Sequence, residues 1–283
     1  MTSLPFRRSP LSLFYSAVLL FALTAAGSLS AAEEDPRPAM GIQDNSFLIE
    51  EAYNQEAGVV QHIFNLTRSV THRSGPDDRE WLFTFTQEWP IGIQDHQFSY
   101  TLPYSYIESG GQSAHGVGDV FINYRYQVAT ETATRPAFAP RFSLIVPTGD
   151  EDKGLGDGTV GYQLNLPVSK VVSDRWTLHA NAGLTFLPDV QGEDLLNFNL
   201  GGSAIFAVSR RLNLMLEAVA NFDEEAGGSR EASVILSPGV RYAFNFKNDS
   251  QLVIGLAAPI GVSAAAPDYG VFVYFSYEHF FKR

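Results

Sequence analysis

Long stretches of alternating apolar and polar residues are the feature of this sequence that most constrains its fold. In "WLFTFTQEW", Trp81, Phe83, Phe85 and Trp89 share one face of an extended chain, and mostly polar residues occupy the other face. Successive side chains of a β-strand point to opposite sides of the sheet. The pattern therefore predicts a strand with one apolar face.

The same alternation predicts about twelve strands in all. They fall near residues 58–71, 79–90, 96–107, 118–129, 137–147, 158–169, 175–187, 195–208, 211–222, 231–245, 250–261 and 269–281. Strands of a soluble sandwich are usually shorter, with turn signals every ~8–12 residues. A tilted membrane-spanning strand needs ~9–11 residues with an apolar face, and a sheet in lipid must close on itself. The sequence thus predicts an all-β fold, an antiparallel up-and-down transmembrane β-barrel over residues 58–283, preceded by an N-terminal non-strand segment.

The connections between these strands alternate in length. Short ones read "VSD", "SR" and "KNDS", and long polar ones read "HRSGPDDR", "ESGGQSAHG", "TGDEDKGLGDG" and "DEEAGGSR"; "ATETATR" is an exception among the short ones. Outer-membrane barrels have short periplasmic turns and long extracellular loops. The phase of the alternation fits a periplasmic N-terminus.

The final stretch, "VFVYFSYEHFFKR", alternates aromatic and β-branched residues. Counted back from Phe281, the face that carries Val271, Val273, Phe275, Tyr277 and His279 is predicted to face lipid. Such a terminal strand resembles the C-terminal signature that the barrel-assembly machinery recognises, which makes that machinery a predicted partner. The alternative is that the strand closes a soluble periplasmic β-protein that binds lipid.

The first 32 residues have the composition of a secretory signal peptide. Arg7 and Arg8 precede the apolar run "LSLFYSAVLLFALTAA", and small residues mark a cut before Glu33. The predicted location is the outer membrane of a diderm bacterium after cleavage.

The chain has no Cys, so disulfide-stapled modules are excluded. Its formal net charge of −12 argues against a nucleic-acid partner.

Three segments together resemble a known family. They are "HGVGDVFINYRYQV", "PRFSLIVPTGDEDKGLGDGTVGYQLNLPVSK" and "WTLHANAGLTF", with Gly116, Gly118 and Asp119 in a G-x-G-D motif and residues 147–149 in a P-T-G motif. This part of the chain resembles the outer-membrane proteins associated with the meta-pathway of phenol degradation. The resemblance implies a barrel distantly related to channels for hydrophobic compounds, such as the long-chain fatty-acid channel. In that wider group an N-terminal segment lies inside the lumen.

Few charged residues fall on the predicted inner face, and most of them lie toward the periplasmic end. The tentative lumen-lining set is Glu88, Asp119, Arg125, Arg141, Glu217, Arg241 and Glu278. Asp119 is expected near the outer mouth and Glu217 near mid-height. These charges either pair with one another as structural filler, because buried charges must be paired, or line a constriction that gates or selects.

The segment at residues 33–57 precedes the first strand. "NSFLIEEAYNQE" offers the apolar side chains Phe47, Leu48, Ile49 and Tyr53 in a stretch too irregular for a strand. We expect either a plug inside the lumen or a periplasmic tail.

No constellation in the sequence predicts an enzyme, a metal site or a cofactor. No histidine pair has metal-ligand spacing, and "DEDKGLGDG" lacks the distal Glu of a helix–loop–helix calcium site. Outer-membrane lipid and lipopolysaccharide are predicted partners of the barrel; its acidic outer loops are expected to be solvated, the alternative being that they hold divalent cations that bridge lipopolysaccharide. The expected function is a passive channel for small hydrophobic or aromatic compounds; the alternative is a structural or surface-contact barrel with a filled lumen.

Overall fold

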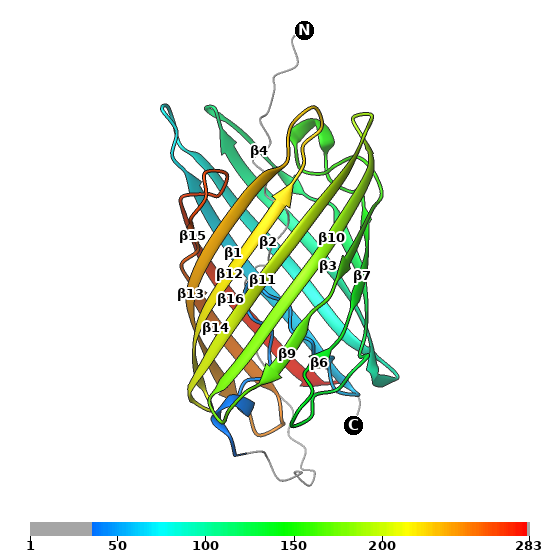
Figure 1. Cartoon of the computed structure of the whole chain (residues 1–283), viewed down its shortest axis with the longest axis vertical. Helices are drawn as coiled ribbons and strands as arrows, with labels where there is room; N and C mark the ends of the chain where they lie inside the picture. Colours follow the sequence, from blue (N-terminus) through cyan, green and yellow to red (C-terminus); the bar gives the residue numbers. More distant parts are fainter. Residues whose placement is uncertain (1–35, 282–283) are drawn as a thin grey trace.

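The computed structural model describes residues 36–281 as a closed antiparallel β-barrel of twelve passes (Figure 1). The predicted signal peptide, residues 1–32, lies outside the described residues. Eight passes are unbroken strands: β1 (Val59–Thr71), β2 (Asp78–Ile91), β3 (Ile93–Ser109), β10 (Trp176–Val190), β11 (Glu193–Ser209), β12 (Leu212–Asp223), β13 (Glu231–Asn245) and β16 (Tyr269–Phe280). Two 3-10 helices, η1 (Pro38–Met40) and η2 (Glu151–Lys153), complete the elements.

Four passes are divided into two strands each. They are β4 (Gln112–Val117) with β5 (Val120–Tyr126), β6 (Ala137–Phe138) with β7 (Arg141–Val146), β8 (Gly161–Asn165) with β9 (Val168–Val171), and β14 (Gln251–Ala257) with β15 (Ile260–Gly261). The uninterrupted strands expected at 137–147, 158–169 and 250–261 are wrong at these points, whereas the strand expected at 118–129 starts at its break and contains β5 undivided. Pro140, Pro167 and Pro259 occupy three of the four breaks, because proline donates no hydrogen bond to the ladder.

One expected loop is a hairpin. The stretch "ESGGQSAHG" was predicted to connect two strands, but β3 and β4 pair within it, from Tyr104–Val117 to Ser109–Gln112. Gly110 and Gly111, with φ of 59° and 79°, form the turn between them. Two positive φ values at the centre of a two-residue loop are typical of tight hairpins.

The barrel closes between its first and last strands. β16 pairs with β1 from Val59–Phe280 to Val70–Tyr269, so no edge is left at this seam. We call the end of the barrel that carries the long connections, such as 72–77, 147–160 and 224–230, the outer end; it is uppermost in Figure 1. The other end, with the tight turn at Gly92, is the inner end.

The two faces of the barrel wall differ in polarity as a lipid-embedded barrel requires. Large apolar side chains are exposed on the outer face, among them Tyr124, Phe142, Leu178, Leu216 and Leu256. Neighbouring positions point inward and are buried and mostly polar, among them Asn65, Thr84, Ser99, Asn123, Gln163, Asn181 and Ser237. This alternation confirms the predicted fold class.

The last strand has aromatic residues on both faces. Val271 is exposed on the outer face, as predicted, but Phe272 and Tyr274 point inward and are buried. The sequence pattern did not indicate a use for these inward rings. No described helix has the length and hydrophobicity to cross a membrane.

Candidate functional site

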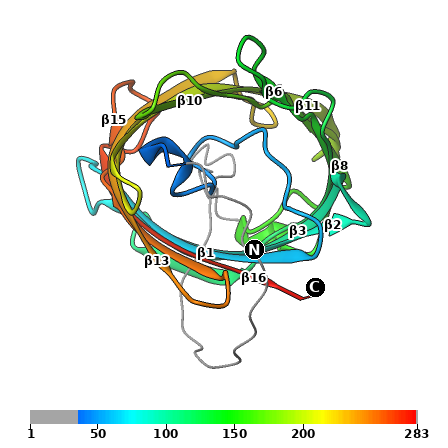
Figure 2. The same ribbon diagram turned by 90° about the horizontal axis from the view of Figure 1, so that it is seen from below.

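Residues 41–57, called here the luminal segment, lie inside the barrel (Figure 2). The segment follows η1 at the inner end and leads into β1 through Gly58, whose φ is 84°. It is not a strand, yet most of its side chains are buried against the wall. Its backbone groups therefore need partners from the wall, since an unpaired buried N–H or C=O is costly.

Arg125 of β5 binds one half of the luminal segment. Its Nε donates to Asn54 Oδ1 (2.8 Å), and its Nη atoms donate to the carbonyl oxygens of Glu51 (3.0 Å) and Tyr53 (2.7 Å). The guanidinium is 2% exposed. Its fixed fork of donors holds three groups of an irregular chain at once.

Arg241 of β13 does the same for the other half. Its Nη1 donates to the carbonyl oxygens of Asp44 (2.8 Å) and Asn45 (2.7 Å). Its Nε donates to Asn213 Oδ1 on β12 (2.9 Å), which fixes the guanidinium to the wall. Two wall arginines thus hold the luminal segment by its backbone.

Glu217 of β12 accepts hydrogen bonds from the part of the luminal segment between those that Arg241 and Arg125 bind. Its Oε1 accepts the backbone N–H groups of Leu48 (2.8 Å) and Ile49 (3.1 Å), and the residue is 0% exposed. Hydrogen bonds to a carboxylate are stronger than neutral ones. Glu217 therefore fixes the middle of the luminal segment.

Arg141 and Glu88 complete the charged group at this level. Arg141 Nε forms an ion pair with Glu50 of the luminal segment (2.9 Å), and Arg125 Nη1 lies 3.3 Å from the same carboxylate. Glu88 accepts from Gln97 (2.9 Å) and lies 4.0 Å from Arg125 Nη2. Most of the charges expected to pair with one another are thus paired with the luminal segment.

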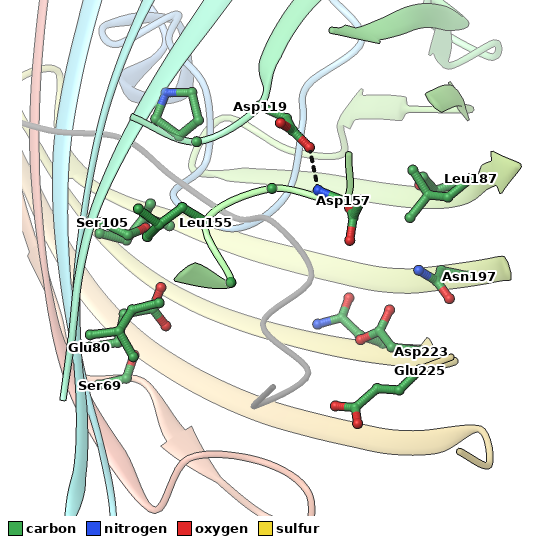
Figure 3. A pocket seen from close by; sticks show the side chains of 18 of the residues that line it. Ser69, Glu80, Ser105, Asp119, Leu155, Asp157, Leu187, Asn197, Asp223 and Glu225 are labelled. Atoms are coloured by element: carbon green, nitrogen blue, oxygen red, sulfur yellow. Dashed lines mark hydrogen bonds between the residues drawn. The ribbon is translucent and has the colours of Figure 1, made fainter. Parts of the chain in front are cut away.

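The remaining two tentative lumen residues lie elsewhere. Glu278 of β16 is opposite Gln61 in the register with β1, near the inner end. Asp119 lies between β4 and β5, where its carboxylate accepts the backbone N–H groups of Gly149 (2.9 Å) and Asp157 (2.9 Å) (Figure 3). The G-x-G-D and P-T-G motifs therefore meet: Asp119 fastens the loop that the second motif begins.

Several uncharged polar side chains of the wall also bind the luminal segment, and the sequence did not single them out. Gln127 Nε2 donates to the Ala52 carbonyl (2.8 Å), and Gln97 Oε1 accepts from Gln55 N (2.8 Å). Gln61 Nε2 donates to Asp44 Oδ1 (2.6 Å), and Ser169 Oγ accepts from Ala52 N (2.7 Å). Each lies at an inward position of the alternation, but uncharged polar residues occupy most such positions and give no distinguishing signal.

Apolar anchors fit into notches of the wall. The Phe47 ring lies 5.2 Å, centroid to centroid, from both Phe272 and Tyr274. It fills the space beside Gly255, where a Cβ would lie 2.2 Å from its Cζ. Ile49 fits against Gly201 in the same way, with 2.3 Å from a Cβ to its Cδ1. In the sequence, a glycine on the inner face of a strand indicates such a notch, because it allows another group to approach the backbone closely.

The other plug candidates are also inside the lumen. Leu48 is 7% exposed, and the Tyr53 hydroxyl donates to Glu131 at the inner end. Asp44, which the sequence did not single out, accepts from the Tyr274 hydroxyl (2.5 Å). Burial raises the pKa of Asp44 above its ordinary value, against the lowering effect of Arg241.

Cavities lie at the outer end, in the middle and at the inner end of the lumen. An outer vestibule of about 240 Å³ is lined by residues of several passes, including Glu80, Asp119 and Asp223 (Figure 3). A middle cavity of about 130 Å³ shares Leu82 and Pro103 with the vestibule. An inner cavity of about 550 Å³ is lined by Arg37, Tyr53 and His179, among others.

The luminal segment contributes to the lining of both the middle and the inner cavity. Its residues Asn45, Ser46, Ile49 and Glu50 line the middle cavity. Its residues Ile42, Gln43, Asp44, Glu51 and Tyr53 line the inner cavity. Within residues 36–281, no group of three or more His, Asp or Glu side chains is placed to hold a metal ion.

A closed barrel of even strand number, apolar outside and polar inside, is the fold of an outer-membrane β-barrel. The chain belongs to the family described as "Putative MetA-pathway of phenol degradation", whose model matches residues 49–278. This match confirms the resemblance drawn from the sequence motifs.

The fold is similar to that of a solved outer-membrane channel. An outer-membrane channel from Pseudomonas putida F1 is 13% identical, with 81% of this chain and 97% of that chain covered and a TM-score of 0.64. The translocator domain of the autotransporter NalP from Neisseria meningitidis is 13% identical, with 78% and 87% covered and a TM-score of 0.47. The search of the curated proteins found no match to this sequence.

Proposed function

We propose that this protein is a passive channel of the outer membrane for small hydrophobic or aromatic compounds, and that the luminal segment closes it. The observation that carries the proposal is the position of this segment, which lines the middle cavity with one face and the inner cavity with the other. Passage from the vestibule to the inner end then requires the segment to move. The family description supports aromatic solutes.

The way the segment is attached supports a movable closure. Hydrogen bonds and ion pairs hold it to side chains on several wall strands, whereas the wall itself is held by continuous backbone ladders. Breaking the side-chain contacts of an irregular segment costs less free energy than opening a closed sheet. The barrel can therefore stay intact while the segment leaves its seat.

The first experiment is conductance in planar bilayers, with and without residues 33–57. Deletion is expected to raise the conductance in discrete steps, and uptake of small aromatic solutes into liposomes is expected to rise with it. Heat-modifiable migration on a gel provides the control that each variant has folded. A folded deletion variant with neither conductance nor uptake would support the alternative, a structural barrel with a filled lumen.

A reversible cross-link separates closure from folding. Ser46 Oγ of the luminal segment lies 2.6 Å from Ser203 Oγ on β11, and the chain has no Cys of its own. A disulfide in Ser46→Cys/Ser203→Cys is expected to hold the channel closed when oxidised and to release it when reduced. The single variants serve as controls and should respond to neither treatment. Equal conductance of the oxidised and reduced double variant would contradict closure by this segment.

A further inference from the structure

The middle cavity lies between the luminal segment and the wall formed by β16, β1, β2, β3, β5, β7 and β8. Two rows of cross-strand neighbours line it. In one row Asn65 of β1 lies opposite Tyr274 on one side and Thr84 on the other, and Thr84 lies opposite Pro103. These four positions all line the cavity.

The second row supplies apolar surface together with satisfied hydroxyl groups. Ile63 lies opposite Thr86, which lies opposite Thr101, and Thr101 lies opposite Phe121. The hydroxyl groups of Thr86 and Thr101 bind each other at 2.9 Å. With Ile49 from the luminal segment and Leu82 from β2, this row gives the cavity an apolar side.

Two polar atoms in the first row have no partner among the described residues. They are Asn65 Oδ1 and Thr84 Oγ1, on side chains that are 1% and 4% exposed. They stand directly across from each other on β1 and β2 and both line the cavity. Buried polar atoms nearly always have a partner, so an unpartnered pair on two residues that line a cavity marks a place for a ligand's polar group.

The charged groups that line the cavity already have partners. Arg141 pairs with Glu50 at 2.9 Å, and Glu88 accepts from Gln97. An ionic solute would have to compete with these contacts, whereas a neutral solute would leave them intact. The volume of about 130 Å³ is close to the roughly 150 Å³ of an engineered cavity that binds benzene.

We propose that the middle cavity is a binding site for a neutral molecule of about one six-membered ring that carries a hydroxyl group. The hydroxyl donates to Asn65 Oδ1 and accepts from Thr84 Oγ1, and the ring packs against Ile49, Ile63 and Phe121. Asn65 and Thr84 then set the preference for hydroxyl-bearing solutes. This inference rests on the proposed function only in taking the bound molecule to be a solute on its way through the lumen.

The test is equilibrium binding of cyclohexanol to the refolded full barrel, with methylcyclohexane as the apolar probe of the same size. NMR signals of the isoleucine δ1 methyl groups report the site. Ile49 and Ile63 should shift with cyclohexanol in a saturable way, while Ile93, exposed at the inner-end turn, reports partition into detergent. Thr84→Val and Asn65→Leu should each weaken cyclohexanol binding about tenfold and leave the weaker binding of methylcyclohexane unchanged or improved.

The matched control is Thr86→Val/Thr101→Val, which removes two hydroxyl groups that satisfy each other in the same cavity. It should keep the preference for cyclohexanol. Equal affinity of wild type and Thr84→Val for cyclohexanol would overturn the proposal, as would shifts at Ile93 alone or occupation by water only. Binding does not depend on conductance, so a barrel that binds cyclohexanol but never conducts would refute the channel and leave the site standing.

Discussion

The ring of Phe47 occupies the space that a side chain at position 255 would fill: a Cβ on Gly255 would lie 2.2 Å from the Phe47 Cζ. This is far inside van der Waals contact, so the wall glycine and the ring of the luminal segment are complementary in shape. The relationship ties the closed state to one position of β14.

Gly255→Ala should therefore unseat Phe47 and raise the open probability of the channel without disrupting the barrel. The added methyl group clashes with the ring, while alanine suits a strand at least as well as glycine does. Single-channel recording measures the change. Gly202→Ala is the matched control, because its Cβ would meet only the His179 carbonyl oxygen, at 3.6 Å. The double variant Gly255→Ala/Phe47→Leu should partly restore closure. An open probability equal to that of Gly255→Ala alone would contradict the steric explanation.

Glu217→Leu should raise the open probability about tenfold or more. The variant leaves the backbone N–H groups of Leu48 and Ile49 without their acceptor, and an unsatisfied buried donor costs about 1–3 kcal/mol. Glu217→Gln keeps an oxygen acceptor and should stay closer to wild type. A glutamine variant as open as the leucine variant would show that charge, and not the pair of hydrogen bonds, holds the segment.

Asp119→Ala should free the loop at residues 147–158 and speed tryptic cleavage after Lys153 roughly tenfold. Two backbone N–H groups of this loop, at Gly149 and Asp157, lose their carboxylate acceptor. Asp119→Asn keeps one acceptor oxygen and should be intermediate. Cleavage after Arg73, in another outer loop, provides the internal reference and should not change.

Channel opening should depend on pH through Glu51. Burial, and next the charge of Asp44, raise the pKa of Glu51 from 4.5 to about 8 in the seated segment, against Arg125 and Arg241. A released segment regains the ordinary pKa, so the seated form binds more protons between these values. Closure is then strongest near pH 4.5 and weakens as the pH rises toward about 8, by at most tenfold per unit.

Open probability recorded from about pH 5 to pH 8 tests this direction. Glu51→Gln, which mimics the protonated carboxyl group, should flatten the dependence and favour closure at pH 8. The variant Glu56→Gln, with its exposed side chain at the end of the segment, is the control. An unchanged pH profile in Glu51→Gln would place the titration on another group.

Periodicity alone predicted the barrel because the lipid imposes it on each pass. A residue such as Leu216 faces lipid and its neighbour Glu217 faces the lumen, so the strand pattern is visible without any knowledge of contacts. The breaks at Pro140, Pro167 and Pro259 could have been read from the same rules. The alternation continues across them, so periodicity alone does not show them.

The partners of the inward charges could not be predicted in this way. Arg125, Arg241 and Glu217 lie at inward positions, but what they bind is an irregular segment more than 70 residues away in sequence, and they bind its backbone. Backbone groups have no sequence signature. Gly255 and Gly201 indicate only that something approaches the strand closely, and the sequence does not show that Phe47 and Ile49 are the residues that do so.

The seam between β1 and β16 has a consequence for biogenesis. The luminal segment precedes β1, yet its partners Phe272 and Tyr274 belong to the last strand of the chain. During assembly the luminal segment is made first, but its binding site on the wall is complete only when β16, the last strand, is in place. Seating of the segment therefore cannot be complete before the last strand is in place, which makes it one of the final steps of assembly.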